Sequence, residues 1–205
     1  MAESIALKGM PVEKKVSYML DKTYEGLVEV GYNKITLDLV AEKVGVSKGT
    51  ISYYFNNKDE LMAKTFEYLS GVVYTEVKPY ANEESDPKQR LVNLVDGFWN
   101  AYWRNPKYPE LMKVYFDLWF HGMHNKSLYD AACVTDARLY DIIYKIVSDI
   151  YNAKDEQSNE DLFTKVIVIA STIDGAAKIV LSGTKDIDQD KLVQELKATV
   201  LKIVD

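Results

Sequence analysis

The sequence predicts an all-α protein, and three observations indicate this class. Apolar residues recur at helical spacing along most of the chain, and no stretch alternates apolar and polar residues as a strand does. The ten glycines and five prolines fall mainly between the periodic stretches. Thr36 and Ser47, both favoured N-cap residues, stand directly before two of those stretches. We therefore expect about nine helices.

Three helices are predicted in the N-terminal part of the chain. The first runs over residues 11–30, and Gly31 ends it, as a glycine just past a helix often does. The second, over 37–44, follows the N-cap Thr36. A glycine turn leads to the third helix, which Ser47 caps and which ends near Phe55.

Six further helices are predicted after the third. Their apolar residues keep the helical period, and two polar segments, over 81–87 and 152–161, interrupt them. The six are expected over about 58–80, 88–104, 110–124, 127–152, 160–182 and 188–204.

Composition narrows the classes of protein to which the chain can belong. Of its 205 residues, 47% are hydrophobic and 27% charged, which is typical of a globular protein with a real core. No apolar run approaches the roughly 20 residues of a membrane span, and residues 1–15 lack the pattern of a signal peptide. The only cysteine, Cys133, excludes an internal disulfide and fits a reducing cytoplasm.

The sequence predicts neither a metal site nor a cofactor. Only two histidines occur, His121 and His124, and two such ligands seldom hold a metal. No nucleophile–base pair and no phosphate-binding loop is apparent, so we do not expect an enzyme.

The charge of the chain argues against nonspecific nucleic-acid binding. The net charge is −6, and residues 1–60 contain eight lysines against nine acidic residues. A sequence-specific binder needs only a local basic or hydrogen-bonding surface. The run from Gly45 to Lys58 contains no acidic residue, so this run is the candidate for such a surface.

Helix, glycine turn and polar second helix together form the pattern of a helix-turn-helix. In that motif the second helix enters the major groove, and its first residues meet base edges. Ile51 and Phe55 have the spacing that holds this helix to its neighbours. The residues left to point outward are Ser47, Lys48, Thr50, Ser52, Tyr53 and Tyr54, and Lys58 can neutralise one more phosphate. The alternative is a small helical hairpin within a core.

Residues 31–61, GYNKITLDLVAEKVGVSKGTISYYFNNKDEL, resemble the TetR family of transcriptional repressors. The resemblance implies an N-terminal DNA-binding domain over 1–57 and a ligand-binding and dimerisation domain over 58–205. It implies DNA contacts from Thr36, Lys48, Thr50, Tyr53, Tyr54 and Lys58. A histidine often stands beside the first tyrosine position in the family, and here both aromatic positions are tyrosines, which bears on the operator sequence.

The C-terminal part resembles, more loosely, the family subgroup that contains choline-responsive repressors. The likeness lies in the helical layout and in Ile173-Asp174-Gly175. Members of the family usually dimerise through their last two long helices, here expected over 160–182 and 188–204. Their apolar faces suit a four-helix packing.

Aromatic residues are concentrated in one part of the chain and predict a ligand site. Residues 98–124 contain nine of the 24 aromatic residues, including all three tryptophans. A cavity lined in this way, with a few polar groups, would bind a planar or cationic small molecule. The alternative is ordinary helix packing. The candidate ligand-binding residues are Trp99, Trp103, Tyr115, Phe116, Trp119, Phe120, His121, Tyr140 and Asp174.

We expect a cytoplasmic homodimer that binds a nearly palindromic DNA operator and leaves it when a small-molecule effector binds. Coupling would pass through the helix that begins at Lys58. Two other functions stay open: a DNA-binding helical adaptor without a ligand, and an enzyme built on the C-terminal helices. Activation in place of repression also stays open.

Overall fold

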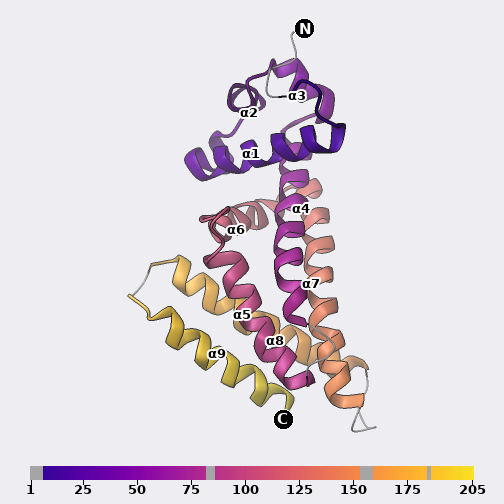
Figure 1. Ribbon diagram of the computed structural model, residues 1–205, viewed down its shortest axis with the longest axis vertical. Coiled ribbons are helices and arrows are strands. Elements are labelled where there is room, and N and C mark those ends of the chain that lie inside the picture. The colour runs from indigo at the N-terminus through magenta and orange to yellow at the C-terminus, as the bar shows by residue number, and fades with distance from the viewer. Residues whose placement is uncertain (1–6, 82–85, 153–158, 184–185) are drawn as a thin grey trace. The chain divides into compact units, whose positions relative to one another are not determined.

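A computed structural model describes residues 7–81, 86–152, 159–183 and 186–205. Every regular element in these ranges is helical, which confirms the predicted all-α class and the predicted number of helices. Figure 1 follows them from α1 in indigo to α9 in yellow. They are α1 (Val12–Lys34), α2 (Leu37–Val44), α3 (Lys48–Tyr54), α4 (Lys58–Val77), the short 3-10 helix η1 (Lys78–Ala81), α5 (Pro87–Trp103), α6 (Leu111–Gly122), α7 (Lys126–Asn152), α8 (Asn159–Leu181) and α9 (Gln189–Val204).

The helix ends agree with the prediction to within a few residues, with one informative difference. Gly31 was expected to end the first helix, yet helical turns continue to Lys34. Gly31 itself is not helical, because its φ of 71° and ψ of 171° lie in a region that only glycine adopts without strain. Its carbonyl oxygen accepts a hydrogen bond from the Ile35 amide (3.2 Å), which closes one more turn beyond the kink.

The chain forms two compact units. The first comprises Met1–Gly71 with Lys113–Thr135, and the second comprises Val72–Met112 with Asp136–Asp205. The first unit therefore extends beyond the proposed DNA-binding domain of residues 1–57 and includes most of α6 and the start of α7. The chain passes from one unit to the other within α4, α6 and α7, so the helix from Lys58 is not the only covalent connection.

The core of the first unit holds α1, α2 and α3 together. α1 packs on α2, and α2 packs on α3. Gly26 lets α1 approach α2 closely, since a Cβ at this position would lie 2.5 Å from Cδ1 of the buried Ile35. Further apolar side chains of these helices that are almost fully buried are Leu20, Leu27, Val40, Val44, Ile51 and Phe55.

The second unit is built mainly on α5, α8 and α9. α9 packs against both α5 and α8. The end of α9 is fixed by two hydrogen bonds to its carbonyl oxygens, from Tyr151 Oη to Val204 (2.9 Å) and from Lys165 Nζ to Ile203 (2.6 Å). Arg90 of α5 is buried and pairs with Asp149 of α7. The predicted polar segments over 81–87 and 152–161 lie largely outside the described residues.

Three further properties of the described residues concern a membrane span, a metal site and the exposure of the cysteine. In the part of the chain that the structure describes, no helix is both long enough and apolar enough to cross a membrane. The same residues contain no group of three or more His, Cys, Asp or Glu side chains that could hold a metal ion. Cys133 is exposed on α7.

Candidate nucleic-acid interface

Side-chain caps define where α2 and α3 begin. Thr36 Oγ1 accepts a hydrogen bond from the Leu39 amide (3.2 Å), and Ser47 Oγ accepts one from the Thr50 amide (3.2 Å). Between the two helices Gly45 adopts the left-handed conformation (φ 77°, ψ 36°), which a glycine adopts without strain. These local interactions produce the helix–turn–helix geometry that the sequence predicts.

α3 presents one buried side and one exposed side. Ile51 and Phe55 are buried at 0% and 2% exposure, whereas Tyr53 is 83% exposed. The rings of Tyr53 and Tyr54 meet edge to face, with centroids 5.1 Å apart. Of the eight predicted DNA contacts, Thr36, Ser47, Lys48, Ser52 and Tyr53 are exposed, and Thr50, Tyr54 and Lys58 are half-buried.

The exposed hydroxyl groups are partly engaged within the protein. The oxygens of Thr36 and Ser47 accept the cap hydrogen bonds, and Ser47 Oγ also lies 3.0 Å from Thr50 Oγ1. A hydroxyl that accepts one hydrogen bond can still donate its own proton. These side chains can therefore cap a helix and bond a phosphate oxygen at the same time.

Lys48, at the start of α3, forms an ion pair with Asp38 in the first turn of α2. Its Nζ lies 2.8 Å from Asp38 Oδ2, and both side chains are exposed. An ion pair between such exposed groups contributes at most about 1 kcal/mol to stability. Asp38 was not among the residues singled out from the sequence.

Lys58 points into the first unit. Its Nζ donates a hydrogen bond to the Tyr32 carbonyl oxygen (2.6 Å) and lies 4.5 Å from the centroid of the Tyr32 ring. Burial is the main cause that lowers the pKa of Lys58 below its usual range. The phosphate contact predicted for Lys58 stays a prediction, and it requires this amine to leave Tyr32.

Tyr32 is held by α6 and the turn that follows it, and we call these contacts the Tyr32 clasp. The Tyr32 amide donates to Asp117 Oδ2 (2.9 Å), and the His121 ring stacks on the Tyr32 ring with centroids 3.8 Å apart. His121 Nδ1 in turn donates to the Asp117 carbonyl oxygen (2.7 Å). The Tyr32 hydroxyl, whose pKa is raised mainly by burial, hydrogen-bonds the Asn125 side chain.

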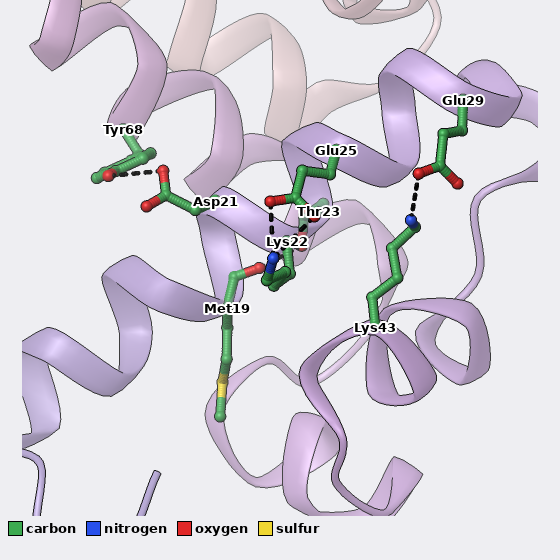
Figure 2. Close-up of polar contacts among 8 residues, drawn as sticks. All are labelled: Met19, Asp21, Lys22, Thr23, Glu25, Glu29, Lys43 and Tyr68. Atoms are coloured by element: carbon green, nitrogen blue, oxygen red, sulfur yellow. Dashed lines mark hydrogen bonds and ion pairs between the residues drawn. The ribbon is translucent and has the colours of Figure 1, made fainter. Parts of the chain in front are cut away.

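Other polar contacts tie α1 to its neighbours in the first unit (Figure 2). Tyr68 Oη of α4 donates to Asp21 Oδ1 of α1 (3.0 Å). Lys43 of α2 pairs with Glu29 of α1 (2.6 Å). Unlike the clasp, these two contacts lie along the body of α1. One joins α1 to α4 and the other joins α1 to α2, so the orientation of α2 relative to α4 is set through α1.

The nine candidate ligand-binding residues are divided between the two units. Tyr115, Phe116, Trp119, Phe120 and His121 belong to the first unit. Among them Tyr115 is buried, with its ring centroid 5.1 Å from that of Phe66, whereas Phe120 is 50% exposed. His121 is part of the Tyr32 clasp, a role that the sequence did not suggest.

The other four candidates, Trp99, Trp103, Tyr140 and Asp174, belong to the second unit. Trp99 is buried and its Nε1 donates to Gln189 Oε1 (3.3 Å), while Trp103 Nε1 is buried without a hydrogen-bond partner among the described residues. Burial, followed by the charge of Asp136, raises the pKa of Asp174 to about 6. The same two carboxylates raise the pKa values of Tyr102 and Tyr140, after burial. The four candidates of the second unit stay predicted ligand-binding residues.

Sequence reasoning missed the side chains that hold the interface together. In the sequence Gly31 is predicted only as a helix end, and Tyr32 stands out only within the family pattern over residues 31–61. The one available signal was the glycine: a Gly-Tyr pair after a long helix indicates a special backbone conformation. The partner residue lies 85 positions away and has no local signature.

The sequence matches one protein family model over residues 19–65, described as "Bacterial regulatory proteins, tetR family". A related protein of Yersinia pestis (strain Pestoides F), the HTH-type transcriptional regulator BetI, is 31% identical over 124 residues. That alignment covers 60% of this chain and 61% of the relative, so it spans less than two thirds of the curated protein.

Solved structures of low sequence identity share the fold. A TetR transcription regulator from Haloarcula marismortui superimposes with a TM-score of 0.76 at 20% identity, covering 94% of this chain and 97% of that chain. The transcriptional regulator FadR from Bacillus subtilis, in complex with stearoyl-CoA, gives 0.73 at 19% identity, covering 91% and 96%. The fold of this chain is therefore shared with these solved structures.

Proposed function

The N-terminal part of this chain belongs to the tetR family of bacterial regulatory proteins, and from that premise we propose that the protein is a ligand-responsive transcriptional repressor. It binds a nearly palindromic operator as a homodimer, and a small-molecule effector releases it. The observation that carries the proposal is the exposed side of α3, where Lys48, Ser52 and Tyr53 point away from the core.

The DNA contact follows from the chemistry of that surface. Hydroxyls and lysines bond phosphate oxygens, and a helix N-terminus favours an anion. The exposed side of α3 offers hydroxyl groups, a lysine and the helix N-terminus. The run from Gly45 to Lys58, which contains α3, has no acidic residue. Each protomer contributes one α3 to one half-site, so the distance between the two helices sets the half-site spacing.

Dimerisation is proposed to occur through α8 and α9. Along α8 three large apolar side chains are exposed: Phe163 (50%), Val168 (45%) and Ile179 (55%). At about 100° per residue, Val168 and Ile179 lie on the same side of α8, and a second copy of the same helices would cover that side.

The effector is proposed to be a planar or cationic small molecule that binds in the second unit. Asp174 and Asp136 supply negative charge close to the aromatic side chains of Tyr102 and Tyr140. A cation beside a half-buried carboxylate would offset its desolvation and favour its charged form. The effector releases DNA only if it binds the two states of the dimer with different affinity.

The DNA contact is tested with a duplex that the wild-type protein selects from a random-sequence library. Lys48→Ala combined with Tyr54→Ala should weaken binding of this duplex at least about tenfold, since each lost contact costs about 1–3 kcal/mol. The control is Lys64→Ala, which removes an exposed lysine of α4. Unchanged affinity of the double variant in a mobility-shift assay would show that α3 is not the reading helix.

The effector is tested by thermal-shift screening of a panel with aromatic cations, neutral aromatics and long-chain acyl thioesters. A hit should raise the Tm of the wild type and lower its affinity for the selected duplex. The adaptor without a ligand would be favoured if no compound did either. Turnover of a panel member that was lost on changing Tyr140 or Asp174 would favour an enzyme.

A further inference from the structure

The ion pair between Asp38 and Lys48 joins the N-terminal ends of α2 and α3. Lys48 Nζ lies 2.8 Å from Asp38 Oδ2, and the two side chains are 57% and 64% exposed. Because the first residues of the second helix meet the base edges, Asp38 lies beside a proposed DNA contact. A carboxylate at this place repels phosphate, so it does not serve general affinity for DNA.

We propose that Asp38 is a specificity-determining residue: through its ion pair it makes Lys48 a reader of base edges in place of a ligand for backbone phosphates. This inference rests on the proposed function, because it requires α3 to be the helix that meets DNA. It adds a role for an acidic side chain of α2.

The ion pair with Asp38 affects contacts of Lys48 with base edges and contacts with phosphates differently. An ammonium group has three hydrogen-bond donors, so a lysine that gives one to a carboxylate keeps two. Those two can meet O6 and N7 of a guanine, which are both acceptors. The attraction to phosphate depends on net charge, and a lysine paired with a carboxylate has a net charge near zero.

It follows that Asp38 weakens sequence-independent binding more than it weakens operator binding. Phosphate contacts are the same in every sequence, whereas guanine acceptors occur only at particular base pairs. When Asp38 is removed, the full charge of Lys48 becomes available to any phosphate. Selectivity is the quantity that should change, and the fold should not, because the pair is exposed.

The test compares Asp38→Asn with wild type on two DNA probes of about 30 base pairs, roughly three helical turns. One is the duplex selected by the wild-type protein, and the other is the unselected random-sequence pool. Fluorescence anisotropy gives the dissociation constants between about 50 and about 200 mM KCl. We expect the pool to be bound roughly two- to fivefold more tightly for each of the two Lys48 side chains that the dimer frees, with a salt slope steeper by about 0.9 for each. The selected duplex should gain less, so the selectivity ratio falls.

Two matched variants separate this mechanism from a general charge effect. Glu67→Gln breaks an equivalent exposed ion pair, Lys64–Glu67, also 2.8 Å long, on α4, and it should leave the selectivity ratio unchanged. The second variant combines Asp38→Asn with Lys48→Ala. In the Lys48→Ala background, Asp38→Asn should change the affinity for the pool less than half as much as it does in the wild type, because Lys48 is absent.

Several outcomes would overturn the inference while leaving the proposed function intact. They are an unchanged ratio in Asp38→Asn, an equal change in Glu67→Gln, or an undiminished effect of Asp38→Asn without Lys48. If Asp38→Asn does not fold, Asp38→Ser replaces it under the same criteria. Failure of the wild-type protein to enrich any duplex or to bind the pool at low salt would instead contradict the proposed function.

Discussion

At the residue scale, Asp174 is a carboxyl group whose pKa is raised by its surroundings. It lies on α8 and is half-buried, and Asp136 adds a second negative charge nearby. Its pKa of about 6 is higher than the value of about 4 expected in an unfolded chain. The folded protein therefore binds more protons than the unfolded chain between these two values, and its free energy of unfolding falls as the pH rises through them.

Asp174→Asn should remove this pH dependence. Above pH 6 the variant should be more stable than wild type, by about 1–3 kcal/mol, because the charged carboxylate no longer has to be buried. Near pH 4 the difference should be small. Thermal unfolding across this pH range measures it, with Asp141→Asn, an exposed carboxylate of α7, as the control. A difference in Tm that did not change with pH would contradict the assignment.

Residue roles were predictable from the sequence where they depend on neighbours in the chain. Thr36 and Ser47 were predicted as N-caps, and both cap the helices that follow them. The side chains that Lys48 and Lys58 contact were not predictable: Asp38 lies ten positions from Lys48, and the Tyr32 carbonyl lies 26 positions from Lys58. Such pairs depend on how helices pack, which local patterns do not encode.

At the scale of elements, the Tyr32 clasp joins the end of α1 to α6, and Lys58 joins the same residue to the start of α4. Gly31 turns the backbone, Asp117 of α6 accepts the Tyr32 amide, and Lys58 of α4 donates to the Tyr32 carbonyl. Three helices thus meet at one residue of the first unit. The position of α4 relative to α1 depends on these contacts.

Gly31→Ala should destabilise the protein by about 1–3 kcal/mol, because a residue with a Cβ is strained at φ 71° and ψ 171°. Gly45→Ala should cost less, about 1 kcal/mol, since its left-handed conformation is open to other residues at a smaller penalty. Denaturant unfolding of the two variants gives both values. A smaller loss at Gly31 than at Gly45 would contradict the backbone geometry described at the kink.

Asp117→Ala should free the Tyr32 amide. Loss of this part-buried hydrogen bond corresponds to about 1 kcal/mol, or roughly a fivefold faster amide hydrogen exchange at Tyr32. The Leu39 amide, which Thr36 caps at the start of α2, serves as an internal control and should not change. Equal acceleration at both amides would indicate general destabilisation and not loss of the clasp.

The elements themselves were predicted well, and their grouping was not. Caps and helical period placed α2 and α3 almost to the residue. The division of α4, α6 and α7 between two compact units has no counterpart in local sequence, because each helix is continuous across the boundary. Seven of the nine predicted ligand residues come from the aromatic stretch over residues 98–124, and the same boundary divides that stretch.

At the scale of the whole molecule, binding of a nearly palindromic operator requires two copies of the chain. A single copy offers one α3, and one helix-turn-helix reads only a few base pairs of one half-site. The proposed surface for the second copy includes the exposed apolar side chains of Val168 and Ile179 on α8. Dimerisation and DNA binding should therefore be lost together when that surface is made polar.

Val168→Glu combined with Ile179→Glu should convert the dimer to a monomer, because a dimer would bury four unpaired carboxylates. Sedimentation equilibrium measures the mass, and the chain has a mass of 23.4 kDa. Met123→Glu, the same change at an exposed apolar residue of the first unit, should leave the mass unchanged. A double variant that stayed dimeric would move the proposed interface away from α8.

The most direct test of the account measures base discrimination by the residues of α3. Dissociation constants are determined for the selected duplex and for duplexes in which each base pair is replaced in turn. We predict that Lys48→Ala loses the discrimination of wild type at a base pair repeated in the two half-sites, by about 1–3 kcal/mol, and that Lys64→Ala loses none. If Lys48→Ala, Thr50→Ala and Tyr54→Ala each kept the wild-type discrimination at every base pair, α3 would not be the helix that reads DNA.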